Sequence, residues 1–317
     1  MPEPPLLSFS QVSKTYPGSH RPSLQNLTLD VGPREILGLV GLNGAGKTTA
    51  IRAAAGVIRL DAGSISVGGF DMLREKVEAS RHLGWVSEYP NFDPVVSGRG
   101  IVRYFAGFRG IFDGEATRLA SNLLDFVGLE SSGDQRFRSL SQGTKKRLAL
   151  AVAMIGDPEV MLLDEILNGL DPEGIALVRR LLLEWRSKGK AILLSSHLLG
   201  EVQQVADRVA VLHRGRLVRI LSKPEISSQR SSVLRISVTD LDAGALAFLA
   251  TKGAVRRDGV TVWLSQPTAG ADEINIELSK RGYHVRELAL ESGRLEDLFF
   301  ELIEEPVPGT DGDEASV

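Results

Sequence analysis

"GLNGAGKT", residues 41–48, is the stretch that decides the fold of this chain. It matches the pattern G-x-x-x-x-G-K-[ST], with Gly41, Gly46, Lys47 and Thr48 at the four specified positions. The apolar run before it, "EILGLVG", predicts a buried strand, and "KTTAIRAAAGVI" after it predicts a helix. A glycine-rich turn with an unrelated lysine is the alternative, but a strand and a helix on either side favour a phosphate-binding loop.

The chemistry of such a loop comes from its backbone and from two side chains. Glycines let backbone N–H groups turn toward an anion, and the helix N-terminus adds its positive end. Lys47 is expected to reach the β- and γ-phosphates, and the Thr48 hydroxyl to bind Mg²⁺. The candidate nucleotide-binding residues of the loop are Gly41, Asn43, Gly44, Ala45, Gly46, Lys47, Thr48 and Thr49. The sequence therefore predicts binding of a nucleoside triphosphate with Mg²⁺.

A pair of acids follows a second apolar run. "VMLLDE", residues 160–165, places Asp164 and Glu165 at the end of a predicted strand. Asp164 is expected to hold Mg²⁺ or its waters, completing the metal site begun by Thr48. A carboxylate beside a bound γ-phosphate can act as general base toward water, and this role is assigned to Glu165. Two solvated acids capping a strand are the alternative, which a preceding phosphate loop makes less favoured.

The first two thirds of the chain alternate apolar runs with helical patterns. "AILLSSH" (191–197) and "VAVLHRG" (209–215) predict further buried strands, and "GIALVRRLLLEWRSKG" (174–189) predicts a helix between such strands. "LSFSQVSKTY" (7–16) and "LQNLTLDV" (24–31) alternate apolar and polar residues, which predicts antiparallel strands. The expected fold is an α/β core of the P-loop NTPase class with an antiparallel β subdomain.

We expect two domains and a tail. Residues 6–223 form the nucleotide-binding domain, with a helical subdomain at about 88–150. Residues 224–232 are rich in serine and predict a linker. Residues 233–305 predict a small α+β domain with the order βαββαβ, as in ferredoxin-like units. Residues 306–317 are acidic and poor in apolar side chains, which predicts a disordered tail.

Composition excludes several classes of protein. The net charge of −3 over 317 residues argues against a nucleic-acid binder that relies on bulk electrostatics. Cysteine is absent, which excludes disulfides and thiolate metal sites. "MPEPPLLSFS" (1–10) lacks the pattern of a secretory signal, and no apolar run reaches the roughly 18 residues that a membrane helix needs. We therefore expect any membrane role to depend on a partner.

The order of motifs identifies a family resemblance. "GLNGAGKT" is followed by "WVSEYP" (85–90), "LSQGTKKRL" (140–148), "VMLLDE", "NGLDP" (168–172) and "LLSSH" (193–197). As a series these resemble the nucleotide-binding subunit of ABC transporters, over residues from about 6 to 221. The resemblance implies the ABC ATPase fold and the hydrolysis of ATP.

The resemblance also implies roles for five more residues. Tyr16 in "VSKTYPG" matches the aromatic residue that stacks on adenine, and His197 matches the switch histidine that contacts the γ-phosphate. Ser141 and Gly143 match the signature that binds the γ-phosphate of a partner subunit, and Asp171 matches the loop that communicates across the dimer. The alternatives are an ordinary aromatic at a strand end for Tyr16 and a helix-capping histidine for His197.

Three motifs depart from the pattern of the family. The signature, usually LSGGQ, has Gln142 and Thr144 here, which still offer backbone N–H groups at a helix start. Glu88 replaces a usual glutamine and is a candidate Mg²⁺ ligand, although it adds negative charge beside a triphosphate. Ile166 replaces the proline that usually follows the catalytic glutamate.

The end of the chain narrows the resemblance to exporters. "GRLEDLFFEL" (293–302) resembles the closing motif of the ATPase subunits of ABC-type-2 drug, sodium and polysaccharide exporters; an ordinary amphipathic helix is the alternative. The resemblance implies a head-to-tail dimer that ATP closes and hydrolysis reopens. It also implies a separate integral-membrane subunit, contacted by the aromatic-rich segment 88–128, and a position at the cytoplasmic face of the cell membrane.

Two other functions stay open. The first is a soluble ABC ATPase that acts on ribosomes or DNA, but this chain has one cassette and no sustained heptads between Thr48 and Ser141. The second is a regulatory P-loop subunit of low turnover. Glu165 and His197 argue against it, whereas Glu88 leaves it open.

Overall fold

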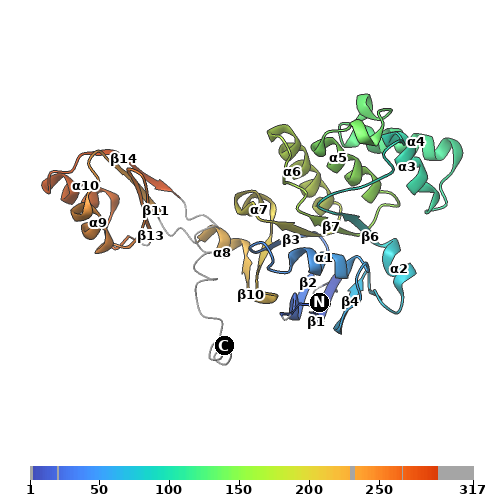
Figure 1. Ribbon diagram of the computed structural model, residues 1–317, viewed down its shortest axis with the longest axis horizontal. Coiled ribbons are helices and arrows are strands. Elements are labelled where there is room, and N and C mark those ends of the chain that lie inside the picture. The colour runs from blue at the N-terminus through green and yellow to red at the C-terminus, as the bar shows by residue number, and fades with distance from the viewer. Residues whose placement is uncertain (1–2, 20, 229–232, 266, 292–317) are drawn as a thin grey trace. The chain divides into compact units, whose positions relative to one another are not determined.

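The computed structural model describes residues 3–19, 21–228, 233–265 and 267–291. The chain divides into two compact units, Met1–Leu221 and Ser222–Val317. The first unit has two sheets and a group of helices, and the second has one sheet (Figure 1).

A six-stranded sheet is the centre of the first unit. Its strands, in spatial order, are β10 (Arg216–Ser222), β9 (Arg208–His213), β3 (Glu35–Val40), β8 (Ala191–Ser196), β7 (Val160–Asp164) and β6 (Leu83–Val86). Neighbouring strands from β9 to β6 are parallel. All residues of β7 and β8 are buried, because a parallel sheet is covered on both faces. The predicted α/β core is confirmed.

A four-stranded antiparallel sheet lies on one side of this core. Its order is β2 (Leu24–Val31), β1 (Leu7–Lys14), β4 (Ala62–Val67) and β5 (Phe70–Asp71). Helix α1 (Lys47–Ala54) packs against β4 of this sheet and against β7 and β8 of the other. Apolar side chains of both sheets and of α1 form one core, which fixes the start of α1 at the edge of the central sheet.

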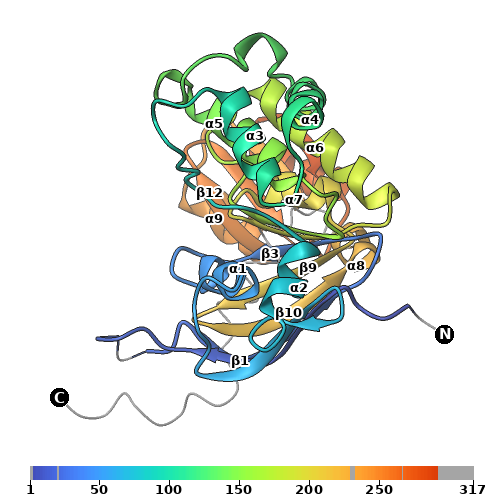
Figure 2. The same ribbon diagram turned by 90° about the vertical axis from the view of Figure 1, so that its right-hand side faces the viewer.

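The remaining helices of the first unit pack on strands or on one another. They are α3 (Gly98–Gly107), α4 (Asp113–Phe126), α5 (Gln142–Ala153), α6 (Pro172–Ser187) and α7 (Leu199–Val205), while the short α2 (Lys76–Arg81) packs on β4, β5 and β6. Helices α3, α4 and α5 pack on one another and form the helical subdomain. In both views α6 and α7 lie across the sheet from α1 (Figure 1 and Figure 2).

The second unit has the predicted order βαββαβ. Its elements are β11 (Val233–Val238), α9 (Ala243–Ala250), β12 (Ala254–Asp258), β13 (Thr261–Ser265), α10 (Ala271–Lys280) and β14 (Val285–Glu291). The sheet has the order β12-β13-β11-β14 and is antiparallel, so β13 lies between the two strands that α9 connects. This is the split arrangement of a ferredoxin-like unit, with α9 and α10 contributing to its core.

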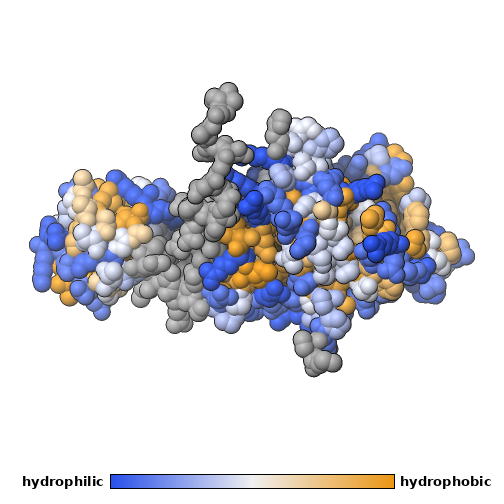
Figure 3. All heavy atoms as spheres, turned by 90° about the horizontal axis from the view of Figure 1, so that it is seen from below, coloured by the Kyte–Doolittle hydropathy of each residue, from blue (hydrophilic) through white to orange (hydrophobic). Residues whose placement is uncertain are grey.

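Three predicted segments fall at the ends of this unit. Within the expected linker the structure has a short helix, α8 (Lys223–Ser228). The amphipathic pattern at 294–305 and the acidic tail at 306–317 lie outside the described residues. In the described part of the chain, no helix is both long and apolar enough to cross a membrane. Figure 3 shows one face of the molecule, where hydrophilic side chains are interspersed with hydrophobic areas.

Candidate nucleotide-binding and catalytic site

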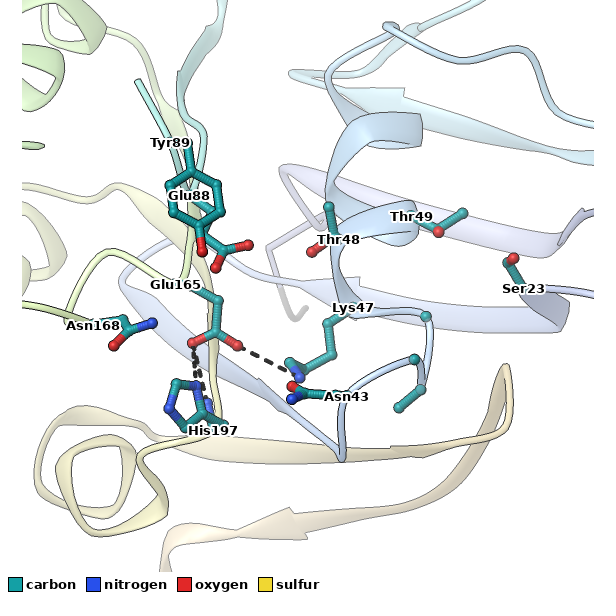
Figure 4. Close-up of a pocket in the computed structure, with 13 residues that line it drawn as sticks. Ser23, Asn43, Lys47, Thr48, Thr49, Glu88, Tyr89, Glu165, Asn168 and His197 are labelled. Carbon is teal, nitrogen blue, oxygen red and sulfur yellow. Dashed lines mark hydrogen bonds and ion pairs between the residues drawn. The ribbon is translucent and has the colours of Figure 1, made fainter. Parts of the chain in front are cut away.

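The carboxyl ends of four parallel strands meet at one edge of the central sheet. Because β3, β6, β7 and β8 run in the same direction, the segments that follow them lie close together, where α/β proteins bind their ligands. A pocket of about 550 Å³ lies at this edge (Figure 4). Its lining residues are Ser23, Asn43, Gly44, Ala45, Gly46, Lys47, Thr48, Thr49, Glu88, Tyr89, Glu165, Asn168 and His197.

The loop between β3 and α1 needs its glycines. Gly44 and Gly46 have φ values of +80° and +109°, in the region that favours glycine. A Cβ atom on Gly46 would lie 2.3 Å from the backbone oxygen of Ser23, and one on Gly41 would lie 2.4 Å from that of Leu212. The first N–H groups of α1 have no partner within the helix, which leaves them for an anion. The geometry fits the binding of phosphate groups.

Lys47 lies between the loop and the end of β7. Its side chain is only 6% exposed, and its ammonium donates a hydrogen bond of 2.8 Å to the backbone oxygen of Gly41. The same nitrogen lies 3.5 Å from Oε1 of Glu165. Figure 4 shows both side chains facing the pocket, with the carboxylate of Glu165 between Lys47 and His197.

Asp164 lies beside the pocket and does not line it. The residue is 1% exposed, and its Oδ1 accepts hydrogen bonds from Ser195 Oγ (2.7 Å) and Thr48 Oγ1 (3.2 Å). Burial raises the pKa of Asp164, and these two hydrogen bonds lower it in part. A carboxylate and a hydroxyl in contact are oxygen ligands of the kind that Mg²⁺ prefers, so the residues present fit this ion.

Glu165 is held at both its side chain and its backbone. Its Oε2 accepts hydrogen bonds from the backbone N–H of His197 (3.3 Å) and lies 2.8 Å from His197 Nδ1. Its backbone N–H donates to the backbone oxygen and to Oγ of Ser195, at 3.2 and 3.1 Å. Its φ is +49°, which is uncommon for a residue with a side chain. The carboxylate is therefore fixed toward the pocket, where a general base can reach a water.

Three lining residues were not among the sequence candidates. Tyr89 follows Glu88 directly, and a hydrogen bond with Glu88 raises the pKa of the Tyr89 hydroxyl. Asn168 opens the "NGLDP" motif, so its position in that motif was an available signal. Ser23, just before β2, belongs to no motif, and nothing in the sequence pointed to it.

Four candidates lie away from the pocket. Ser141 is exposed and caps α5 by accepting a 3.2 Å hydrogen bond from the N–H of Thr144. Gly143 lies in the first turn of α5. Asp171 is exposed and caps α6. Tyr16 lies just after β1, with the Lys14 ammonium 5.9 Å from its ring centre. The structure thus brings the phosphate loop, Glu88, Glu165 and His197 together, but not these four.

Asp164→Asn is expected to stabilise the protein measured without metal or nucleotide. The amide oxygen can still accept the hydrogen bonds of Ser195 and Thr48, while the cost of burying an ionised carboxylate disappears. Because the folded pKa of Asp164 is raised, its contribution to stability is lost as pH rises through that pKa. The Tm gain of the variant, measured in EDTA, should therefore be larger at pH 8 than at pH 5.

Asp171→Asn is the matched control, because Asp171 is exposed and asparagine caps a helix about as well as aspartate. We expect its Tm to stay near that of the native chain at both pH values. A lower Tm for Asp164→Asn at pH 8 would contradict the account of a carboxylate buried at a cost.

Comparison with known proteins agrees with this geometry. The family model described as "ABC transporter" matches residues 24–168. The Nod factor export ATP-binding protein I of Burkholderia thailandensis is 37% identical over 212 residues, which cover 67% of this chain and 69% of that protein. The bacitracin transport ATP-binding protein BcrA of Bacillus licheniformis is 29% identical over 303 residues, covering 94% and 97%.

A solved structure of an ATP-binding subunit of an ABC transporter superposes with a TM-score of 0.65 at 25% identity, covering 86% of this chain and 99% of the other. The resemblance inferred from the series of motifs is confirmed, and so are the α/β fold and the binding of ATP. The chain belongs to the ATP-binding subunits of ABC transporters, in the group of exporter ATPases.

Proposed function

We propose that this subunit hydrolyses Mg²⁺-ATP with Glu165 as general base, within a head-to-tail dimer that drives a separate membrane subunit. The observation that supports the catalytic assignment is the position of the Glu165 carboxylate. It lies between Lys47 and His197 and faces the pocket of the phosphate loop. The proposal makes a second copy of this chain and an integral-membrane protein its two partners.

The residues assigned to catalysis and binding have distinct parts in this proposal. The N–H groups from Asn43 to Thr49 and the ammonium of Lys47 bind the phosphates. Glu165 accepts a proton from the attacking water, while His197 orients the carboxylate and contacts the γ-phosphate. Thr48 and Asp164 would hold Mg²⁺, with Glu88 as a further oxygen ligand from the end of β6. The ion when bound would neutralise charge that develops on the phosphates.

In the proposed dimer, each copy supplies the signature residues that contact the nucleotide bound by the other copy. Ser141 does not line the pocket of its own chain, but it is exposed at the start of α5, where it can meet the γ-phosphate bound by a partner. Gly143 lies in the same turn, and Asp171 is exposed at the start of α6. Tyr16 is assigned to adenine, as a half-buried ring just after β1.

We assign the contact with the membrane partner to the helical subdomain. Tyr104 on α3 and Phe108, the residue just after this helix, are 65% and 72% exposed and lie in edge contact, with ring centres 5.2 Å apart. Phe112, just before α4, is 63% exposed. An aromatic surface of this kind suits a protein partner. This partner would hold the subunit at the cytoplasmic face of the cell membrane.

Glu165→Gln is expected to lower ATP turnover by about 10²- to 10⁴-fold, since the amide cannot accept the proton of the water. Binding of ATP should be kept, because Glu165 makes no part of the phosphate loop, and the ATP-bound dimer should accumulate. Phosphate release measures turnover, and light scattering after gel filtration with ATP measures the dimer.

Glu184→Gln is the control for this variant, because Glu184 on α6 pairs with Lys188, just after that helix, and neither residue lines the pocket. It should keep native turnover. If Glu165→Gln turns over ATP at the native rate, Glu165 is not the base. If the native chain itself has negligible turnover, the low-turnover regulatory function is favoured instead.

Ser141→Asp is expected to weaken the ATP-dependent dimer of the Glu165→Gln chain at least about tenfold, or about 1.4 kcal/mol. Aspartate still caps α5, so the helix is kept, but its charge would face the γ-phosphate of the other copy. Ser97→Asp is the matched control, because Ser97 caps α3 with the same bond to an N–H three residues on. An unchanged dimer in Ser141→Asp would exclude the head-to-tail arrangement.

The double variant Tyr104→Ser/Phe108→Ser is expected to lose most of an integral-membrane protein that co-purifies with the native chain from detergent extracts. Removal of two exposed aromatic side chains takes away contact area without altering the pocket, so turnover of the isolated chain should stay native. Val77→Ser, 69% exposed on α2, is the control. Recovery of the native chain on ribosomes, with no membrane protein, would favour a soluble ABC ATPase.

A further inference from the structure

Lys146 is a buried lysine that the proposed mechanism does not use. It lies on α5 and is only 5% exposed. Its ammonium donates hydrogen bonds to the backbone oxygens of Glu165 (2.5 Å) and Asn168 (2.7 Å). Lysine is almost never this buried unless its charge is paired or hydrogen-bonded, so these two bonds account for its position.

The two carbonyl groups belong to one tight turn after β7. The N–H of Asn168 donates to the backbone oxygen of Glu165 at 3.2 Å, which closes the turn, and Lys146 binds the carbonyls at both of its ends. Ile166, inside the turn, is fully buried, so the turn cannot move without disturbing the core. Lys146 thus clamps the segment that leads from the catalytic strand toward Asp171 and α6.

The backbone of Glu165 needs such a clamp. A residue with a side chain at φ +49° is strained and persists only where its surroundings fix it. Ser195, on β8, fixes the N–H of Glu165, and Lys146, on α5, fixes its carbonyl oxygen. The direction of the Glu165 carboxylate therefore depends on two elements, of which one is the helix that begins at the signature.

Helix α5 joins the exposed signature to the buried turn. Ser141 caps its first turn, and Lys146 lies little more than one turn further along the same helix. A short continuous helix moves as one piece, so a shift of Ser141 along the helix axis shifts Lys146 and the carbonyl that it binds. Burial lowers the pKa of Lys146, and the charges of Glu88, Glu165 and Asp164 offset part of this effect.

We propose that Lys146 is a positioning residue that fixes the Glu165 backbone and passes the position of the signature helix to the general base of the same subunit. This inference rests on the proposed function, because it takes Glu165 as the base. In this proposal, Ser141 contacts the nucleotide bound by the partner subunit, and this contact affects the general base of the subunit to which Ser141 belongs.

Lys146→Met tests this role, because methionine keeps an unbranched apolar stem and removes the donors. We expect kcat for ATP hydrolysis to fall about 10- to 100-fold, since a displaced catalytic group costs this much, while KM stays within about twofold. The Kd of a non-hydrolysable ATP analogue with Mg²⁺ should also stay native, because Lys146 does not line the pocket. Lys146→Gln, with an amide donor, should give an intermediate kcat at native KM.

Lys145→Met is the matched control, because Lys145 is the neighbouring residue on α5 and its ammonium lies over the Phe137 ring, 5.0 Å from the ring centre. It should change neither kcat nor KM. In the Glu165→Gln background, Lys146→Met should cause no further loss of turnover, because the group that it positions is already inactive.

Several results would overturn the inference. One is native kcat in a folded Lys146→Met chain, or in Lys146→Gln if the methionine variant does not fold. Another is equal loss of kcat and of analogue binding in both variants, which would assign Lys146 to the fold alone. Normal turnover in Glu165→Gln would instead overturn the proposed function, so the two failures are distinguishable.

Discussion

The buried contact between Lys47 and Glu165 connects the two halves of the site. Lys47 begins α1, and Glu165 follows β7, so the 3.5 Å contact joins the phosphate loop to the segment after β7. Both side chains are nearly inaccessible, so each charge partly compensates the other, and the Lys47 ammonium also donates to the backbone oxygen of Gly41. The position of the phosphate loop and the position of the turn that contains Glu165 are therefore linked through this contact.

The sequence predicted those residues whose position follows from strand ends. The loop at 41–48, Asp164, Glu165 and His197 each lie at or directly after the end of a buried strand, and parallel strands bring their carboxyl ends to one edge. The βαββαβ order of the second unit was predictable in the same way, from alternating periods of apolar residues. In both cases a local pattern and one rule of topology were sufficient.

Long-range contacts between loops and helices could not be predicted in this way. Ser23 reaches the pocket because the segment before β2 passes behind Gly46, a contact that depends on how the two sheets pack. Lys146 gave no signal either, since a basic residue in "LSQGTKKRL" is expected on a solvated helix face and is instead buried. The left-handed backbone of Glu165 was also not predictable, because glutamate has no local preference for it.

The departures at the signature and at Glu88 have different physical consequences. At the signature, the cap on α5 needs the Ser141 hydroxyl and the backbone N–H of Thr144, and any residue at 144 provides that N–H. The variant signature "LSQGT" therefore keeps the N-terminal cap of α5. Glu88, by contrast, adds a carboxylate to the pocket; burial is the main cause that raises the pKa of Asp164, and the charge of Glu88 adds to that rise. The same charge attracts the ammonium of Lys146. The change at the signature therefore leaves the backbone of a helix start as it is, whereas the change at 88 alters the charge around a buried carboxylate.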